Sequence, residues 1–390
     1  MGEGPGHVTY RRGASPGAPT AARTGRSLLR GWLWTGACAM LFGAGGLVFA
    51  VGVGAELGAL ASVVGLLAAL LPLLLVIPAV LWLDRVEAEP PRYLIAAFLW
   101  GACVAAAVSL LLNTGTMLLI AQAAGEESAL LVGLVVIAPV VEEVSKGLGV
   151  LLVLLLRRRE FDGVVDGIVY AALVAAGFAF AENVLYFGRG LVEGGPSGLV
   201  AVLVVRGLFS PFAHPFFTAC TGVGLGLAAA RPRGLLRWIA PLIGLALAIG
   251  LHALWNASTM LGVEGALSAY LFGQFPLFLV VIGFALWARR REARVIARFL
   301  DGYARVGWFT PQEVEMLSSL PTRRRAREWA QRMGGSAAMA DMRRLQDDGV
   351  ELALLRQRIQ HGAASPDAAT QERALLEDIA AARARLYGPR

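Results

Sequence analysis

The chain alternates between long apolar runs and short polar loops over its first 288 residues. A helix needs about 20 apolar residues to cross the hydrocarbon core of a bilayer. Eight runs come near this length, at about 31–53, 57–83, 94–121, 129–156, 164–187, 198–230, 238–261 and 267–288. The pattern therefore predicts an all-α polytopic membrane protein with about eight transmembrane helices. Pro211 and Pro215 lie in the sixth run, which we expect to be kinked, tilted or preceded by an interfacial segment.

The composition agrees with this fold class. The 390 residues are 57% hydrophobic and 16% charged, and the mean hydropathy is +0.63. These values exclude a soluble protein. The three cysteines lie within apolar runs and lack CxxC spacing, so we interpret them as packed core residues.

Basic residues are distributed unevenly between successive loops. Arginines cluster before the first run and after the second, fourth, sixth and eighth runs, whereas the alternate loops carry glutamates, with Arg189 as an exception. Basic loops are retained in the cytoplasm, so both termini are predicted to be cytoplasmic in a multi-pass protein of the cell membrane. The net charge of +7 reflects this bias and the C-terminal tail, and no nucleic-acid partner is expected.

The composition divides the chain into three regions. Residues 1–30 are rich in Gly, Pro and Arg and are predicted to form a disordered cytoplasmic N-terminus. Residues 31–288 form the transmembrane domain, with its core at 129–261. Residues 289–390 are charged and favour helix, and Thr310 followed by a proline is typical of a helix start. This predicts a helical cytoplasmic tail that contacts a partner or regulates the domain.

Ionisable residues inside the apolar runs are concentrated in the fourth to seventh runs. Glu142 and Glu143 lie near the middle of the fourth run, one turn before Lys146, the only lysine in the chain. Such a group costs roughly 2.5–3.5 kcal/mol at a helix centre on insertion scales, so three of them need partners, water or a function. With a rise of about 1.5 Å per residue, His214 and His252 fall at a similar depth. These residues are therefore expected to form one polar centre.

A second polar layer is predicted about two turns further toward the extracytoplasmic side, where Glu182 and Asn256 fall. Arg206 is expected to pair with Glu182 or to extend toward the interface. Pro139 lies one turn before the glutamates, and it should kink its helix and free a backbone carbonyl.

Four motifs in these runs resemble those of the PrsW-type intramembrane proteases, which belong to a wider superfamily of CAAX prenyl protease-like membrane glutamate proteases. They are Glu142-Glu143-Val-Ser-Lys146, Phe178-Ala-Phe-Ala-Glu182-Asn183, His214-Pro-Phe-Phe-Thr218 and His252-Ala-Leu-Trp255-Asn256. The ordered set covers roughly half of the chain and excludes the tail. The resemblance implies a membrane-embedded peptidase that cleaves a single-span membrane protein, such as an anti-sigma factor.

Peptide hydrolysis requires a base for water, a group that stabilises the oxyanion and an acid for the leaving amine. The candidate catalytic residues are Glu142, Glu143, His214, His252 and Asn256, with Lys146, Glu182 and Asn183 as supporting residues. Either glutamate is the expected base. The histidines and Asn256 are expected to stabilise the reacting carbonyl.

The residues leave the cofactor open. Two histidines and one glutamate satisfy a tetrahedral zinc site with one position for water, so His214, His252 and Glu143 are the predicted ligands if zinc is used. The HExxH motif is absent, and the resemblance also admits a metal-free glutamate–histidine mechanism.

Two functions without proteolysis compete with this interpretation. A proton-coupled transporter would also place ionisable groups in the middle of the membrane, although no inverted repeat is evident in the sequence. A non-catalytic membrane scaffold is the third alternative, in which the same residues only pack and pair.

Overall fold

The computed structural model describes residues 21–85, 88–158, 161, 163–231, 234–362, 364 and 366–388. The helices are α1 (Ala21–Leu83), α2 (Pro91–Leu99), α3 (Ala106–Ala124), α4 (Glu126–Val132), α5 (Ala138–Leu156), α6 (Val164–Val202), α7 (Ala213–Ala230), α8 (Leu236–Thr259), α9 (Gly262–Ala269), α10 (Phe275–Arg305), α11 (Pro311–Ser318), α12 (Leu320–Gln360) and α13 (Ala368–Tyr387). Short π-helical stretches connect some of them, at Trp100–Ala105, Gly133–Ile137, Leu203–Phe209 and Tyr270–Gln274. These ranges contain no strand, which confirms the all-α class.

Six helical segments are long and apolar enough to cross a membrane. Two of them, Thr35–Leu83 and Val164–Ala230, span 49 and 67 residues, enough for two crossings each. Each contains a glycine with a non-helical backbone, Gly58 with φ 73° and Gly195 with φ 61°, a conformation that glycine adopts without a Cβ clash. Dividing both segments there is compatible with the predicted eight crossings. That number and the side of the termini stay predictions.

The first helix begins earlier than predicted. α1 starts at Ala21, whereas the sequence pattern placed residues 1–30 in a disordered region and the first crossing at 31. The residues before Ala21 lie outside the described part of the chain.

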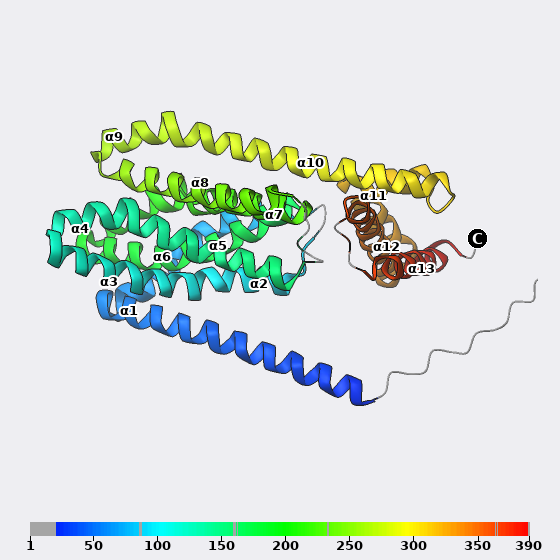
Figure 1. The fold of residues 1–390 in the computed structure, drawn as a ribbon, viewed down its shortest axis with the longest axis horizontal. Helices are drawn as coiled ribbons and strands as arrows, with labels where there is room; N and C mark the ends of the chain where they lie inside the picture. Colours follow the sequence, from blue (N-terminus) through cyan, green and yellow to red (C-terminus); the bar gives the residue numbers. More distant parts are fainter. Residues whose placement is uncertain are drawn as a thin grey trace, which may run out of the picture.

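α6 forms the centre of the bundle, where it contacts α1, α2, α5 and α7 (Figure 1). Glycines allow these helices to approach closely, as Gly167 and Gly222 do where α6 crosses α7, since a Cβ on either would collide with the backbone of the other. In lipid such close packing, together with interhelical hydrogen bonds, replaces the hydrophobic effect as the force between helices. The crossing fixes the spacing between the helices that carry Glu182 and His214.

The sixth predicted run is interrupted in its middle. The π-helical stretch ends at Phe209, the backbone leaves the helix at Ser210, and α7 begins at Ala213. Pro211 has no N–H to donate, which favours an end to the helix there. The break confirms the expected kink and places irregular backbone beside His214.

The tail is helical, as predicted, and has a hydrophobic core of its own. Leu317, Leu345, Leu352 and Ile379 are fully buried in it. The Thr310 hydroxyl accepts a hydrogen bond from the backbone N–H of Glu313, and the Glu313 carboxylate accepts one from the backbone N–H of Thr310, which confirms the predicted helix start. α10 runs without interruption from the membrane domain into this core (Figure 1).

Candidate active site

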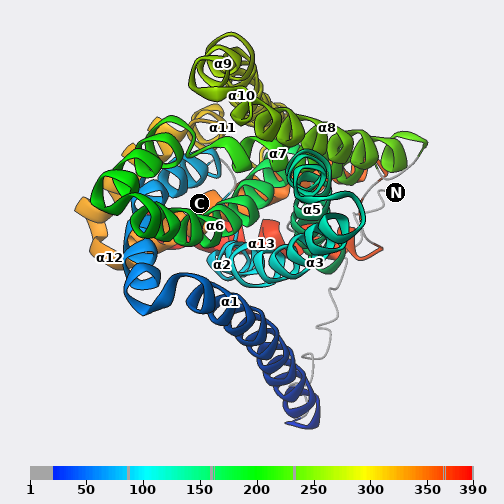
Figure 2. The same cartoon turned by 90° about the vertical axis from the view of Figure 1, so that its left-hand side faces the viewer.

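Four helices bring the predicted polar residues together, and Figure 2 looks along the bundle in which they lie. The four helices are α5, α6, α7 and α8. α5 contacts each of the other three, and α7 packs against both α6 and α8. We call the six side chains at their meeting point the buried polar cluster. Its members are Glu142, Glu143 and Lys146 from α5, Glu182 from α6, His214 from α7 and His252 from α8.

Glu143 has both carboxylate oxygens engaged. Oε1 accepts a hydrogen bond from Lys146 Nζ at 2.6 Å and lies 3.0 Å from His252 Nδ1. Oε2 accepts a hydrogen bond from the Thr218 hydroxyl at 2.8 Å. The residue is fully buried, so these three donors take the place of water around its charge.

Glu142 has a different environment although it is the next residue. Its Oε1 accepts a hydrogen bond from Asn113 Nδ2 at 3.3 Å. Its Oε2 has no hydrogen-bond partner among the described residues, and it lies 3.8 Å from both Lys146 Nζ and His252 Nε2. Glu142 therefore offers an available oxygen within the buried polar cluster.

Asn113 was not among the predicted site residues. It comes from α3, outside the four helices that the sequence motifs mark. The sequence could have indicated Asn113, because it is an amide within an otherwise apolar run, and such a group requires a polar partner in the membrane.

Each histidine has one ring nitrogen beside a carboxylate. His214 Nε2 lies 2.9 Å from Glu182 Oε2, and His252 Nδ1 lies 3.0 Å from Glu143 Oε1. An ionised carboxylate only accepts hydrogen bonds, which assigns the ring protons to these two nitrogens. The remaining nitrogens are then acceptors, His214 Nδ1 beside Lys146 at 3.1 Å and His252 Nε2 beside Glu142. The rings lie 5.0 Å apart, edge to face.

Glu182 also pairs with Arg206, through the same oxygen that faces His214, as expected from the sequence. Arg206 Nη2 pairs with Glu182, Arg206 Nε donates to Asn183 Oδ1 at 2.8 Å, and its guanidinium lies 3.9 Å from the centre of the Tyr186 ring. Glu182 and Asn183 thus link the cluster to the π-helical stretch before α7.

Asn256 forms a hydrogen bond with the backbone of the segment before α5. Its Nδ2 donates to the carbonyl oxygen of Leu134 at 2.8 Å, in the π-helical stretch just before Pro139. Because proline cannot donate to the preceding turn, a carbonyl there needs another donor, and Asn256 supplies one. The expected free carbonyl before Pro139 is present, in a π-helical stretch, whereas the kink and the stabilisation of an oxyanion by Asn256 stay predictions.

Three buried residues of the cluster are placed to hold a metal ion together. Ligand atoms of Glu142, His214 and His252 all lie within 4.8 Å of one another. This set contains Glu142 in place of the predicted ligand Glu143. Glu143 already accepts three hydrogen bonds, whereas Glu142 Oε2 accepts none among the described residues.

A comparison with protein families decides the class of the molecule. The model of the PrsW family of intramembrane metalloproteases matches residues 89–286. The chain belongs to this family. As a PrsW family member it is a membrane-embedded peptidase and a multi-pass membrane protein, and all predicted site residues lie within the matched range. This favours proteolysis over transport. No match was found among curated proteins or among solved structures.

Proposed function

We propose that this chain hydrolyses a peptide bond in or near the membrane in a single-span protein, such as an anti-sigma factor. The observation that supports this most is the convergence of Glu142, His214 and His252 from three helices, with one carboxylate oxygen available. Hydrolysis requires a proton acceptor and electrophilic groups around one reacting carbonyl. Glu142 supplies the proton acceptor, and the Lys146 ammonium, 3.8 Å from Glu142 Oε2, supplies the positive charge beside it.

Glu142 is the proposed proton acceptor for the attacking water. Asn113 fixes its other oxygen by a hydrogen bond, which leaves Oε2 directed toward the reacting atoms. Glu143 is instead a positioning residue in this proposal. Its hydrogen bonds hold the His252 ring and the Lys146 ammonium in place, as carboxylates behind catalytic histidines do. Glu182 has the same positioning role for His214.

The residues also fit a zinc ion. Glu142, His214 and His252 would hold it and leave one position of a tetrahedral site for water. Glu142 would then be a ligand instead of the proton acceptor. The charge balance is favourable, because the cluster and Arg206 combine three carboxylates with two cations and leave a net negative charge. A bound zinc ion would act as a Lewis acid and promote ionisation of water at neutral pH. Glu182 and Glu143 would fix the orientation of the two histidine ligands.

Lys146 provides a positive charge beside both histidine and glutamate. Its Nζ lies 2.6 Å from Glu143, 3.1 Å from His214 Nδ1 and 4.2 Å from the centre of the Phe178 ring. We propose that Lys146 keeps one carboxylate, that of Glu143, ionised and stabilises negative charge on the reacting carbonyl.

The test is co-expression with tagged single-span membrane proteins, followed by detection of the cleaved product. We expect Glu142→Gln to abolish cleavage, since an amide fills the same volume but takes no proton, while the protein still inserts into the membrane. Glu193→Gln, which removes an exposed carboxylate of the same domain, is the matched control and should cleave normally. Wild-type cleavage by Glu142→Gln would refute the proposed role, and the absence of cleavage by the wild type against a broad panel would favour a scaffold.

A further inference from the structure

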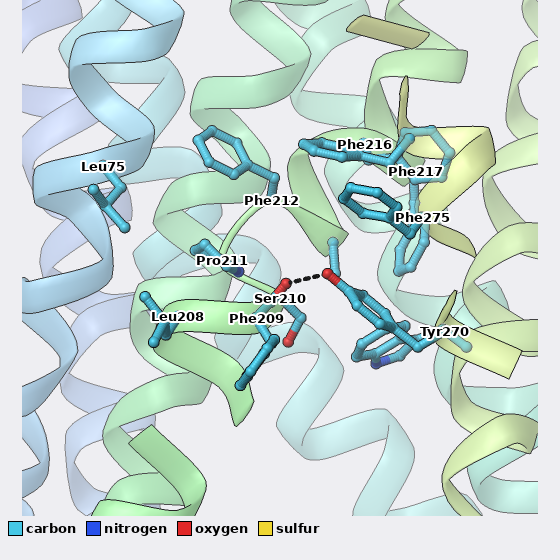
Figure 3. Close-up of a pocket in the computed structure, with 13 residues that line it drawn as sticks. Leu75, Leu208, Phe209, Ser210, Pro211, Phe212, Phe216, Phe217, Tyr270 and Phe275 are labelled. Carbon is cyan, nitrogen blue, oxygen red and sulfur yellow. Dashed lines mark hydrogen bonds between the residues drawn. The ribbon is translucent and has the colours of Figure 1, made fainter. Parts of the chain in front are cut away.

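An aromatic pocket lies beside the buried polar cluster and has no role in the proposed chemistry. Its volume is about 380 Å³, at the lower end of the roughly 300–1,000 Å³ typical of ligand pockets. Figure 3 shows rings from α7 and from the start of α10 facing one another across it. The residues that line it are Leu75, Leu208, Phe209, Ser210, Pro211, Phe212, Ala213, Phe216, Phe217, Trp255, Tyr270, Phe275 and Phe278.

The pocket is suited to an apolar ligand. Eight of the thirteen lining residues are aromatic, none is charged, and hydroxyl groups come only from Ser210 and Tyr270. The Tyr270 hydroxyl is not free, because it donates to the carbonyl oxygen of Phe209 at 2.8 Å and joins the two walls (Figure 3). A large apolar side chain would lose little hydration on entering from lipid and would gain dispersion contacts with the rings.

The pocket extends from an exposed rim to a floor that packs on His252. Its rim is exposed, with Leu208 65% and Phe209 57% accessible, whereas Phe216 and Phe217 form a buried floor. Phe217 stacks on the His252 ring with centroids 5.2 Å apart. A substrate helix in the bilayer can therefore insert a side chain from the side, next to the cluster.

A second, polar cavity continues the pocket toward the cluster. It measures about 10 Å³, close to the smallest space that holds one water. Ser210, Pro211, Ala213 and Trp255 line both cavities, and Asn183, Arg206 and His214 complete the walls of the polar one. A substrate side chain that binds in the aromatic pocket would thus place the substrate backbone next to residues 210–212, where the helix is broken, and beside His214.

We propose that the aromatic pocket is the specificity subsite of this peptidase, and that it binds a large apolar side chain, preferably aromatic, of the substrate's membrane-spanning segment next to the cleaved bond. This inference rests on the proposed function. It identifies the substrate class as single-span proteins with such a residue beside the cut.

The first test narrows the pocket from its α1 wall. Leu75→Trp fills space in the pocket, while Leu74→Trp, at a neighbouring residue that is 70% exposed and does not line it, is the matched control. After the cut is mapped in a cleaved single-span reporter, the flanking residues are changed in turn to Ala, Leu, Phe and Trp. We expect the wild type to prefer Phe or Trp at one flanking position. Leu75→Trp should lower that preference by about tenfold relative to Ala, and Leu74→Trp should leave it unchanged.

The second test does not depend on cleavage. A photoreactive benzoyl-phenylalanine replaces Phe278 in the pocket or Phe272, which is 83% exposed and outside it, in membranes that contain the tagged single-span reporters. We expect crosslinks to the reporter from position 278 and few from position 272. Cleavage with no side-chain preference, or crosslinks from position 278 to lipid alone, would overturn the subsite. Crosslinks from position 278 without cleavage by the wild type would support the subsite and refute the proposed function.

Discussion

Two adjacent glutamates on one helix have opposite surroundings. The carboxylate of Glu143 is fully buried and accepts three hydrogen bonds, whereas Glu142 keeps an oxygen without a donor among the described residues. Removal of one partner from a buried ion pair costs roughly 3–5 kcal/mol, because the remaining charge is left without compensation. The two residues should therefore differ in their effect on stability as well as on activity.

We predict that Lys146→Met lowers the free energy of unfolding by about 3 kcal/mol, since it leaves Glu143 buried without its cation. Lys146→Met combined with Glu143→Gln should recover most of this loss, because the second change removes the remaining charge. Thermal unfolding of the four proteins of this double-mutant cycle in detergent provides the measurement. Equal and additive losses from both changes would show that the pair does not interact.

The hydrogen bond from Asn113 gives a second prediction. Asn113→Leu removes the donor to Glu142 Oε1, and a hydrogen bond to a charged group is worth about 1.5–3 kcal/mol. We expect kcat to fall by about tenfold or more, with little change in KM. The conservative Asn113→Gln should restore part of the rate, and unchanged kinetics for Asn113→Leu would mean that Glu142 needs no such support.

At the scale of the helices, irregular backbone occurs where the site is built. α7 begins beside the cluster after the break at 210–212, and α5 follows a π-helical stretch. Irregular backbone at this depth is tolerated only where protein or a water-filled cavity surrounds it. Here the backbone carbonyls that lose their helical hydrogen bonds find donors within the protein. The Phe209 carbonyl accepts from the Tyr270 hydroxyl, and the Leu134 carbonyl accepts from the Asn256 amide.

The turn at Gly195 allows a test of whether its positive φ contributes to the stability of the fold. Gly195 has φ 61° and open space around it, so Gly195→Ala adds backbone strain of about 1–2 kcal/mol without a clash. Gly194→Ala is the matched control, because that residue is equally open and has no positive φ. We predict a lower melting temperature for Gly195→Ala only, measured in detergent. A similar loss from both changes would show that the positive φ of Gly195 is not its cause, because alanine has a higher helix propensity than glycine.

The sequence predicted which helices carry the site but not how they are rotated against one another. Pro139 and Pro211 predicted the two interruptions of the α-helical hydrogen bonding, because the N–H that a proline lacks can be read from the sequence alone. The histidines were expected at the depth of the glutamates, as the rise per residue implies. The separate roles of Glu142 and Glu143, and the contribution of Asn113, depend on which faces of three helices meet, and no single periodicity contains that information.

At the scale of the whole molecule, the tail is a second packed unit that contains raised carboxyl pKa values. Burial raises the pKa of Asp348 to about 6, and the carboxylates of Asp378 and Glu351 act in the same direction. The folded tail therefore binds a proton more tightly than the unfolded tail does. Its free energy of unfolding must rise as the pH falls through about 6, and the gain is complete below the unfolded value near 4.

We predict that amides of α12 and α13 in the full-length protein exchange hydrogen more slowly at about pH 5 than at pH 7.5, after correction for the intrinsic rate. Asp348→Asn should remove most of this difference, because the amide does not titrate. A pH dependence that persists in Asp348→Asn would assign it to another group.

α10 connects the aromatic pocket with the tail. Phe278 lines the pocket and Ile296 lies in the tail core, and both belong to one helix without interruption. About 27 Å of helix separates them, so a pivot of about 10° around the middle moves each end by roughly 2 Å. If α10 tilts as a rigid rod, its two ends therefore move together. A displacement of the tail core would then shift Phe278 in the wall of the aromatic pocket.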